Sequence, residues 1–409
     1  MIDLLVISHA CVEPINRVPF QGMEALGWRT EIATAAHVEL PGLSKDAKPR
    51  GVGDPPMHFL PLMGKSPRLF RFKGLLDLLE ARRPRVVLLD YDPGTILALE
   101  VGTWARLRSA HLVCFSYDNL PRTIAAAFER QRLKGVAFAG MVRALSTAAG
   151  PLVDHVFALS NDSLETLRSL GFGSRMSKIP LGFDPTRFRP NPALRAEVRT
   201  KLGLKEVTVA YFGRLSPEKG VHLLLEALAG LADRPWQLLL DRFAAYTHSY
   251  TEELEGHIDR LGLRSRIVFF DATHAEMPGF MNAADIVALP SIANARWREQ
   301  YGRVAPEAMA CGRLVVASTS GALPELVGDA GILVPPNDVA ALRRALDRAM
   351  SDEGMRIALG ARAERLAREE RSLRVQVQIM DRLFRRWGAP TAAPIPDLRA
   401  GETLPSRTN

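Results

Sequence analysis

Short apolar runs alternate with longer segments of helical periodicity along most of the chain, and this alternation restricts its fold more than any other feature. In the first half the runs include Ile2–Ser8, Arg85–Leu89 and His111–Phe115. Continuous apolar runs are typical of strands buried on both faces, and the helices between them are the connections that parallel strands require. The sequence therefore predicts an α/β fold built on parallel sheets.

The alternation is interrupted once, by residues 180–192 (PLGFDPTRFRPNP), and starts again with the apolar run Val207–Phe212. A chain of 409 residues is long enough for two domains of roughly 150–200 residues. We predict two Rossmann-like domains, residues 1–185 and 186–371, whose parallel sheets face each other across a ligand-binding cleft. Residues 372–388 are predicted to form a C-terminal helix. Residues 389–409, rich in Pro, Thr and Ala, are predicted to be a disordered tail.

The composition limits the classes of partner. The net charge is +8, and residues 1–190 carry 24 basic against 18 acidic residues. A basic excess can attract acidic lipids, nucleic acid or phosphorylated ligands, but no basic run is interleaved with aromatic residues, so nucleic acid is not expected. The three cysteines, Cys11, Cys114 and Cys311, are far apart and fit a reducing compartment such as the cytoplasm. No run of 18 apolar residues occurs, so no membrane span is expected.

A candidate anion site follows the predicted strand Val207–Phe212. Ser216 is a good N-cap and Pro217 suits the first helical position, so Lys219 is expected in the first turn of a helix. Arg214 and Lys219 would then both lie at the positive end of that helix, where cations oppose the dipole. The pair is explained if a diphosphate binds there, and the alternative is two solvated surface cations.

A second candidate site holds two glutamates, Glu299 and Glu307, separated by seven residues in EQYGRVAPE. Pro306 is tolerated only in a first turn, so a helix is expected to begin near Arg303. Glu299 then lies in the preceding loop and Glu307 about one turn inside the helix, while Gly302 permits close approach of the backbone to a ligand. Two carboxylates suit the hydroxyls of a sugar or ribose; the alternative is that either is a helix-surface residue.

Together these segments resemble glycosyltransferase family 4, which contains the glycosyl transferases group 1 domain. The run Glu299–Pro335 resembles its signature, with the two spaced glutamates, EAMACG, a buried strand, a small-residue turn before LPE and a closing GILVPP. Residues 212–220 (FGRLSPEKG) resemble its phosphate-binding loop, 179–190 its interdomain segment, and 284–291 (ADIVALPS) the strand before the glutamates. The similarity is strong from residue 179 to 346 and weaker before.

The resemblance implies a GT-B fold, with residues 372–388 crossing back to the first domain. It also implies a retaining transfer of a hexose from a nucleotide-diphosphate sugar to a glycan, a lipid-linked acceptor or a small molecule, with no cofactor and no metal. The leaving group is a nucleoside diphosphate, and side-chain cations can stabilise its growing charge where other enzymes use a divalent ion. We expect a cytoplasmic enzyme of polysaccharide or glycoconjugate biosynthesis, with the inner face of a membrane as a candidate location.

By the same resemblance, particular residues receive roles on the donor side. Arg214 and Lys219 match the pair that neutralises the diphosphate, and Glu299 matches the carboxylate on the hydroxyls of the donor sugar. These three form the expected catalytic set. Glu307 matches the carboxylate on the ribose. The loop whose backbone reaches sugar and phosphate corresponds to Tyr301, Gly302 and Arg303.

The first half supplies candidates for the acceptor side. Polar residues that follow predicted strands should line the cleft, although each can also be a cap or a solvated loop residue: His9, Glu13, Asn16, Arg17, Asp92 and Asn119. Asp90-Tyr91-Asp92 is also a D-x-D motif of the kind that holds a metal in GT-A transferases. Because the second half already offers a cationic site for the diphosphate, hydrogen bonding of Asp92 to the acceptor is the preferred interpretation.

Three segments depart from the family pattern. Residues 242–246 (RFAAY) replace a Gly-rich turn near the base, residues 9–20 contain no glycine where members have a Gly-rich loop, and residues 115–122 contain no histidine. Two alternatives therefore stay open: a nucleotide-sugar epimerase or phosphorylase-like enzyme on the same scaffold, and a non-catalytic sugar-nucleotide-binding subunit. Residues 122–150 mix basic, small and apolar residues, which predicts either a helix packed in its domain or an amphipathic helix on an anionic membrane.

Overall fold

The computed structural model describes residues 2–40, 43–64, 66–122, 124–242 and 248–394. The chain forms two compact units. The first contains residues 1–182 together with the segment that starts at Leu373, and the second is Phe183–Ser372.

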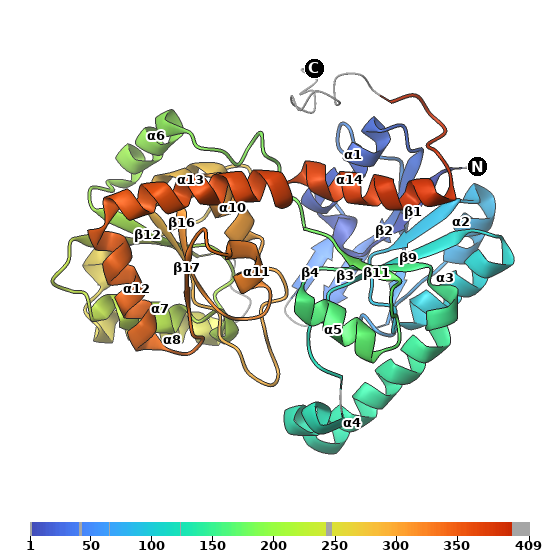
Figure 1. Ribbon diagram of the computed structural model, residues 1–409, viewed down its shortest axis with the longest axis horizontal. Helices are drawn as coiled ribbons and strands as arrows, with labels where there is room; N and C mark the ends of the chain where they lie inside the picture. The colour runs from blue at the N-terminus through green and yellow to red at the C-terminus, as the bar shows by residue number, and fades with distance from the viewer. Residues whose placement is uncertain (1, 41–42, 65, 123, 243–247, 395–409) are drawn as a thin grey trace. The chain divides into compact units, whose positions relative to one another are not determined.

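A parallel sheet forms the centre of the first unit, and within the described part of the chain it has seven strands in the order β11-β10-β9-β8-β1-β2-β5 (Figure 1). Every residue of β1, β8 and β10 is buried, as expected for strands covered on both faces. The strands are β1 Leu4–Ile7, β2 Thr30–Ala35, β5 Met57–Leu60, β8 Val86–Leu89, β9 His111–Ser116, β10 His155–Ala158 and β11 Met176–Lys178.

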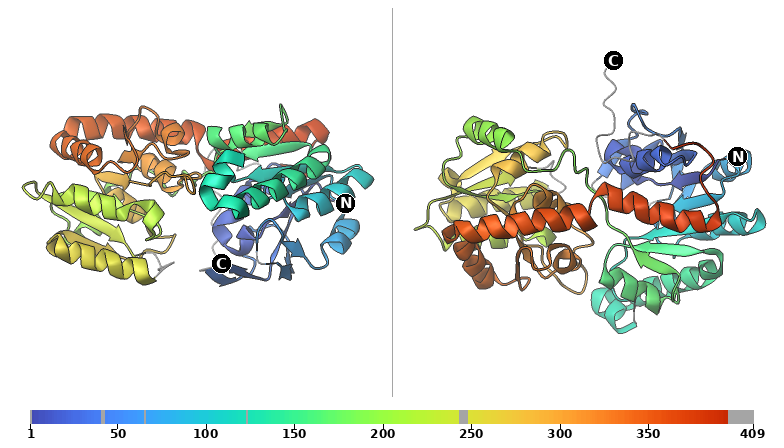
Figure 2. Two further views of the ribbon diagram at one scale, coloured as in Figure 1. Left: turned by 90° about the horizontal axis from the view of Figure 1, so that it is seen from below. Right: turned by 45° about the horizontal axis from the view of Figure 1, so that its top comes forward.

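The helices of the first unit are α1 Val18–Ala25, α2 Leu75–Arg82, α3 Ile96–Leu107, α4 Ile124–Ala149, α5 Asn161–Ser169 and α14 Leu373–Phe384. The hydroxyl of Ser160 caps α5 by accepting a hydrogen bond from the Ser163 amide, as its sequence predicts. α14 packs against α1 (Figures 1 and 2), and the indole of Trp28 donates a hydrogen bond of 2.8 Å to Asp381 of α14. The C-terminal helix therefore belongs to the first unit.

Two small antiparallel pairs correct the sequence-based expectations. The Pro, Gly and Lys content of residues 41–56 predicts a loop, but β4 Leu43–Asp46 lies within them and pairs with β3 His37–Leu40 in a hairpin. The sequence predicts a helix around Leu69–Arg82, but β7 Arg71–Phe72 pairs with β6 Leu62–Met63, so α2 starts at Leu75. In both cases the pairing of neighbouring chain segments overrides local composition.

The second unit repeats the architecture. Its parallel sheet has, over the described residues, six strands in the order β14-β13-β12-β15-β16-β17. The strands are β12 Val207–Tyr211, β13 Trp236–Asp241, β14 Ile267–Phe270, β15 Ile286–Leu289, β16 Leu314–Ser318 and β17 Ile332–Val334. The fold class predicted from the apolar runs is confirmed in both units.

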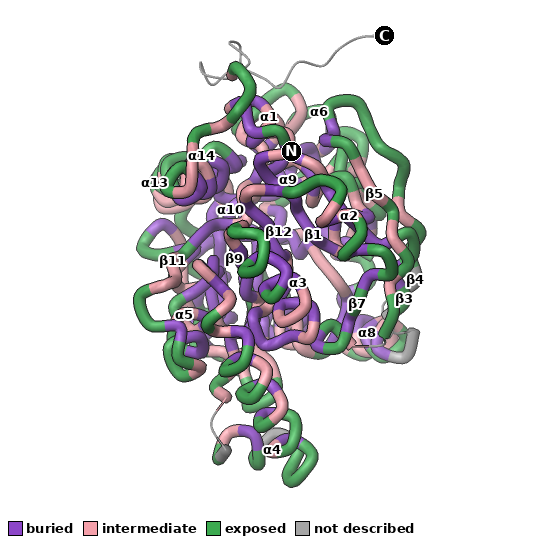
Figure 3. The backbone as a smooth tube through the Cα atoms, turned by 90° about the vertical axis from the view of Figure 1, so that its right-hand side faces the viewer, coloured by how far each residue is buried: buried purple, intermediate pink, exposed green. Residues whose placement is uncertain are grey.

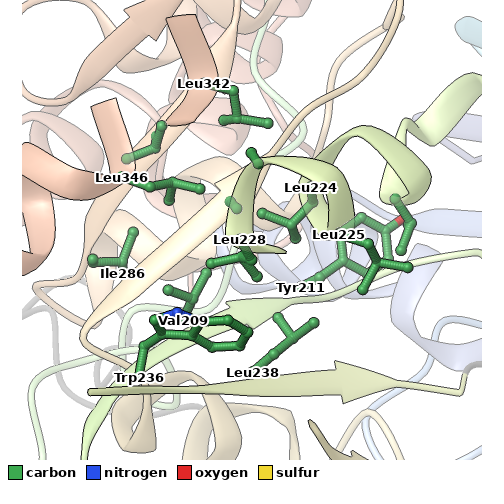
Figure 4. Packing of buried hydrophobic residues seen from close by; sticks show 14 of the residues in the cluster. Val209, Tyr211, Leu224, Leu225, Leu228, Trp236, Leu238, Ile286, Leu342 and Leu346 are labelled. Atoms are coloured by element: carbon green, nitrogen blue, oxygen red, sulfur yellow. The ribbon is translucent and has the colours of Figure 1, made fainter. Parts of the chain in front are cut away.

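The helices of the second unit are α6 Pro192–Leu202, α7 Val221–Ala229, α8 His248–Arg260, α9 Met277–Ala283, α10 Val304–Ala310, α11 Leu323–Val327, α12 Val339–Ser351 and α13 Glu353–Glu370. α6, α9 and α11, each with a proline in its first turn, were not predicted from the sequence. One face of the sheet is covered by α7 and α12, whose leucines pack with Trp236 and Ile286 in a buried cluster (Figure 4). This core holds the strand ends in place beneath the loops described below.

Residues 389–394 are the described part of the predicted disordered tail, and they make defined contacts with the first unit. The amide and hydroxyl of Thr391 both donate to the carboxylate of Asp3, at 3.1 and 2.7 Å. The remainder of the predicted tail, residues 395–409, lies outside the described residues. None of the described helices combines the length and the apolar character needed to cross a bilayer.

Candidate functional site

The loops that follow β12 and β15 form the centre of the candidate site in the second unit. The two strands are parallel neighbours, so both loops leave the sheet at its carboxyl edge, where open α/β sheets bind ligands. The amide of Ile292 donates to the carbonyl of Glu218 at 3.0 Å and joins the loops. Gly220 has φ +70°, and a Cβ there would lie 2.1 Å from the carbonyl oxygen of Pro290. The loops therefore pack backbone against backbone, which only glycine permits at this position.

The loop after β12 corrects the predicted helix start. Pro217–Lys219 form a single 3-10 turn, and α7 begins at Val221, after the left-handed Gly220. Ser216 occupies the N-cap position of the turn but does not cap it, and its buried Oγ has no hydrogen-bond partner among the described residues. Lys219 therefore precedes α7. Lys219 lies in the turn that follows Ser216 and Pro217, as predicted, but this turn does not continue into α7, because Gly220 adopts a conformation that an α-helix cannot continue.

Lys219 and Glu299 form an ion pair across the two loops. The ammonium Nζ of Lys219 lies 2.7 Å from Oε2 of Glu299, and the hydroxyl of Ser291 donates to the same oxygen at 2.8 Å. The side chains of Lys219 and Glu299 are only 18% and 9% exposed. Two residues that the sequence placed 80 positions apart are therefore joined in one partly desolvated site.

The backbone of Glu299 is held by the turn that follows β16. Its amide donates to Oγ of Ser320 at 3.1 Å, and its carbonyl accepts from the amide of Ala322 at 3.1 Å. Gly321 lies between them with φ +53°, and a Cβ on it would be 1.9 Å from the Glu299 carbonyl oxygen. The small-residue turn noted in the sequence is thus required for the position of Glu299.

Arg214 lies on the same loop as Lys219, directly after the left-handed Gly213, which has φ +125°. The carbonyl of Arg214 accepts a hydrogen bond of 2.7 Å from the hydroxyl of Tyr211. Burial raises the pKa of Tyr211 well above its ordinary value, so this hydroxyl keeps its proton and holds the loop.

The second glutamate lies on α10. This helix begins at Val304, directly after Arg303, as the position of Pro306 predicted. Gly302 is left-handed, with φ +82°, and turns the chain between the loop and the helix. Tyr301 is buried, whereas Arg303 is exposed. Glu307 is partly buried, and loss of hydration raises its pKa to about 7 against the opposing charges of Arg303 and Arg187.

Arg187 and His274 belong to the surroundings of Glu307 but were not singled out from the sequence. A guanidinium nitrogen of Arg187 donates to the carbonyl of His274 at 2.6 Å. Burial, together with the charges of Arg187 and Arg303, lowers the pKa of His274 to about 4, so its imidazole is neutral at pH 7. Arg187 lies within the family-like segment 179–190, which was the available signal; His274 carried none.

In the first unit, three neighbouring strands, β9, β8 and β1, bring polar residues to one edge of the sheet. Asp92, after β8, is engaged by the segment after β9: one carboxylate oxygen accepts from the Ser116 hydroxyl at 2.6 Å and from the Tyr117 amide at 3.1 Å. The other oxygen lies 3.2 Å from Arg68. Asp92 therefore connects the segment after β9 with Arg68 and orders this edge of the first sheet.

Asp90 has a separate set of partners. Its two carboxylate oxygens accept from the hydroxyls of Ser8 and Tyr117, at 2.6 and 2.8 Å. His9 packs against Tyr91, with ring centroids 5.0 Å apart, and burial lowers its pKa although the Asp90 charge opposes this. His9 is thus a partly buried imidazole beside a carboxylate, and burial disfavours its charged form.

The other acceptor-side candidates differ in character. The side-chain amide of Asn16 donates to the Ala10 carbonyl at 2.7 Å and closes a local turn, while Asn119 is buried. Arg17 does not line a cleft: it is fully buried and paired with Asp54 at 2.8 Å. The expectation for Arg17 is therefore wrong, because its guanidinium serves the surrounding backbone carbonyls and one carboxylate.

The remaining candidate features are metal ligands, cysteine thiols and the turn that follows β13. Over the residues that the structure describes, no group of three or more His, Cys, Asp or Glu side chains is arranged to hold a metal ion. All three cysteines are buried, and burial raises the thiol pKa of Cys311 to about 12. Residues 243–247, most of the unusual turn after β13, lie outside the described residues.

Solved structures show the class of fold. A sucrose-phosphate synthase from Thermosynechococcus elongatus superimposes with a TM-score of 0.72 at 20% identity, covering 94% of this chain and 99% of that one. Anabaena HepE, solved in complex with UDP, superimposes with a TM-score of 0.71 at 21% identity over the same shares. The fold is the GT-B fold of glycosyltransferases, as the motifs predicted.

The sequence comparison then identifies the domain. Residues 195–366, which lie within the second unit, match the family model of glycosyl transferases group 1. D-inositol 3-phosphate glycosyltransferase of Corynebacterium jeikeium is 37% identical over 194 residues, which cover 44% of this chain and 45% of the relative. The chain spans about half the length of the curated relatives it matches.

Proposed function

We propose that the chain is a retaining glycosyltransferase of family 4 that moves a hexose from a nucleotide-diphosphate sugar to a glycan, lipid-linked or small-molecule acceptor. The observation that supports it is the ion pair between Lys219 and Glu299 at the carboxyl edge of the second sheet. One member of the pair suits phosphate oxygens and the other suits sugar hydroxyls. The group 1 domain and the relation to a D-inositol 3-phosphate glycosyltransferase support the same reaction class.

The proposed donor site follows from the chemistry of each group. Arg214 and Lys219 hold the diphosphate, and Glu299 accepts hydrogen bonds from the sugar. Nζ of Lys219 lies 2.7 Å from Oε2 of Glu299. A ligand that contacts both groups must therefore carry its phosphate and its hydroxyls close together, as a sugar 1-diphosphate does. The bond that breaks would therefore lie beside the ammonium. Glu307 is proposed to contact the ribose.

The proposed chemistry needs no protein nucleophile. As the bond from the sugar to the diphosphate breaks, negative charge grows on the leaving phosphate, and the two cations stabilise it. A leaving phosphate oxygen accepts the acceptor's proton on the face from which the acceptor attacks, so the configuration is retained. We propose that this reaction needs no bound metal, since the cations of Arg214 and Lys219 act on the diphosphate. Tyr301, Gly302 and Arg303 would bring backbone groups to the sugar and phosphate.

The acceptor is proposed to bind at the edge of the first sheet. His9, Asn16, Asp92 and Asn119 remain the candidates. Asp92 and Asn16 already make internal hydrogen bonds, so their role would be to hold the loops that contact the acceptor. His9, beside the Asp90 carboxylate, is the candidate with an imidazole whose charged form is disfavoured by burial.

A panel of nucleotide sugars, scored by thermal shift, would identify the donor, and release of nucleoside diphosphate on adding acceptors would measure transfer. Glu299→Ala should remove most transfer and leave nucleoside diphosphate binding largely intact. Arg214→Ala and Lys219→Ala should each weaken that binding by about tenfold or more, since each removes a charge-assisted contact. Glu353→Ala, an exposed carboxylate at the start of α13, is the matched control. Full turnover by Glu299→Ala would contradict the sugar-contact assignment.

We also propose that the first unit contacts the inner face of an anionic membrane through the outer part of α4. This helix is interrupted at Gln131 and Arg132, and a Cβ on Gly135 would lie 2.0 Å from the Ala127 carbonyl oxygen. The segment before the interruption therefore packs against the segment after it. Figure 3 shows this outer part extending from the first unit, with mostly exposed residues.

Apolar and basic groups are exposed together on this outer part. The exposed fractions are 53% for Phe128 and 78% for Leu133, and the neighbouring Arg132 and Lys134 are exposed as well. Exposed apolar side chains flanked by cations are complementary to an anionic lipid surface. Co-sedimentation with vesicles containing phosphatidylglycerol should be lost when Phe128 and Leu133 are both replaced by serine. Leu107→Ser, at a 72% exposed site on α3, is the control, and equal sedimentation of all proteins would contradict the proposal.

A further inference from the structure

We infer that Trp297 is a positioning residue of the proposed donor site, and that it acts by holding the ammonium group of Lys219. The expected effect of Trp297 on diphosphate binding rests on the proposed function. Its geometric basis is independent of that function, because it concerns contacts among residues of the second unit only.

The segment between β15 and Glu299 is a closed turn. The side-chain oxygen of Asn294 accepts hydrogen bonds from the amides of Arg296 and Trp297, at 2.8 and 2.9 Å. The amide of Asn294 in turn donates to the carbonyl of Trp297 at 3.0 Å, which makes an isolated antiparallel bridge. An asparagine that bonds to the backbone two and three residues ahead is a strong local turn former. The position of Trp297 is therefore determined by the turn itself.

The base of this turn is anchored to the rest of the unit. The hydroxyl of Ser320 donates to the carbonyl of Ile292 at 2.7 Å, and the side-chain amide of Asn337 donates to the carbonyl of Ala293 at 3.2 Å. Ser320 also accepts from the amide of Glu299 at 3.1 Å. One hydroxyl thus ties both ends of the segment that carries Trp297.

The indole of Trp297 faces the ammonium of Lys219. Nζ lies 5.3 Å from the ring centroid, within the range of a cation–π interaction, for which tryptophan is the strongest partner. The same ammonium is bonded to Glu299, only two residues after Trp297. Lys219 is therefore contacted by an aromatic ring and a carboxylate that belong to one short loop.

This arrangement lowers the side-chain entropy that Lys219 would lose on binding a ligand. A lysine side chain rotates about four carbon–carbon bonds and loses considerable rotamer freedom when it is fixed on a ligand. The backbone at Lys219 is already restrained by the left-handed Gly220. The indole restrains the end of the side chain without consuming a hydrogen-bond donor, so the two N–H groups of the ammonium that do not bond to Glu299 can serve phosphate oxygens. Pre-ordering of this kind raises affinity by lowering the entropy lost on binding.

The first test measures the binding of UDP, GDP and ADP by isothermal titration calorimetry. Trp297→Ala should raise the Kd of the diphosphate that binds by about fivefold, the expected size of a partly shielded cation–π contact, and Trp297→Phe by no more than about twofold. In a Lys219→Met background, Trp297→Ala should change the Kd by less than about twofold. Arg296→Ala, an exposed neighbour on the same turn, should bind as the wild type does. Wild-type affinity in Trp297→Ala, or an equal loss in the Lys219→Met background, would overturn the inference.

The second test needs no nucleotide. In protein labelled with 13C at the lysine ε-carbon, the ε-proton signal of Lys219, assigned by its absence in Lys219→Met, should be displaced upfield by the indole ring current. The displacement should persist in Arg296→Ala, be smaller in Trp297→Phe, whose ring is smaller, and vanish in Trp297→Ala. A Lys219 signal at the position of solvent-exposed lysines in the wild type would overturn the inference. If the wild type binds none of the three diphosphates, the proposed donor site fails, and this signal alone decides the role of Trp297.

Discussion

Replacing Glu307 with glutamine should remove a pH dependence from the stability of the second unit. Burial raises the pKa of Glu307 from 4.5 to about 7, while the charges of Arg303 and Arg187 oppose the change. An unfolded chain ionises this carboxyl at its ordinary pKa, so between these two values the folded state binds more protons than the unfolded state. The stability associated with protonated Glu307 is therefore fully present below the unfolded pKa and is lost as the pH rises through about 7.

The difference between the two pKa values sets the size of the effect. Each tenfold change in proton affinity is worth about 1.4 kcal/mol, so the pKa difference corresponds to roughly 3 kcal/mol of unfolding free energy in total. Roughly 2–3 kcal/mol of this falls between about pH 5 and pH 8, because the unfolded carboxyl is already mostly ionised at the lower end. Glutamine has nearly the same volume and does not ionise in this range.

The assay is urea unfolding of the wild type and of Glu307→Gln, measured side by side across that pH range. The comparison is necessary because His274, whose pKa is lowered to about 4, has the opposite effect: its contribution is present above the ordinary histidine pKa and is lost as the pH falls. Relative to the wild type, Glu307→Gln should become more stable as the pH rises. Glu353→Gln, at an exposed site, should run parallel to the wild type. If the free energies of unfolding of wild type and Glu307→Gln also run parallel, Glu307 is not a desolvated carboxyl and the reasoning fails.

Three further outcomes are expected. Gly321→Ala should cost about 3 kcal/mol of unfolding free energy, because its Cβ would lie 1.9 Å from the Glu299 carbonyl oxygen; an unchanged Tm would contradict this. Asp54→Ala should cost about 3–5 kcal/mol, since it leaves the buried Arg17 without its carboxylate, and wild-type behaviour in urea would be the contrary result. Transfer activity should persist in excess EDTA; loss that manganese restores would instead implicate Asp90 and Asp92 of the D-x-D motif.

Much of the fold is predictable because its strands are buried on both faces. The fully buried β15 lies within the predicted strand segment 284–291, and α4 lies within residues 122–150, which were predicted to be helical. Two helix starts were also predictable from local signals, Ser160 before α5 and Pro306 in the first turn of α10. Short elements were not: the hairpin of β3 and β4 depends on pairing, and β4 lies in residues 41–56, whose Pro, Gly and Lys content resembles that of a loop.

The residues of the candidate donor site were predictable as types, but their relations were not. The two cations and two glutamates stand out by spacing and by family resemblance. That Lys219 is paired with Glu299, and that Ser291 bonds to the same carboxylate oxygen, depends on the adjacency of β12 and β15, which are far apart in the chain. Trp297 and His274 gave no signal, because an isolated aromatic or histidine in a loop is usually structural.

By itself the sequence determined two α/β units, the group 1 signature and the residues proposed to bind a donor, because buried strands, helix starts and short motifs are encoded over a few neighbouring positions. Only the tertiary structure decided which charges meet. Gly220 and Gly321 matter because a Cβ at either would strike the backbone of another loop, a contact that no local pattern shows. The ion pair that supports the proposed function exists because parallel neighbouring strands deliver two distant loops to one edge of a sheet.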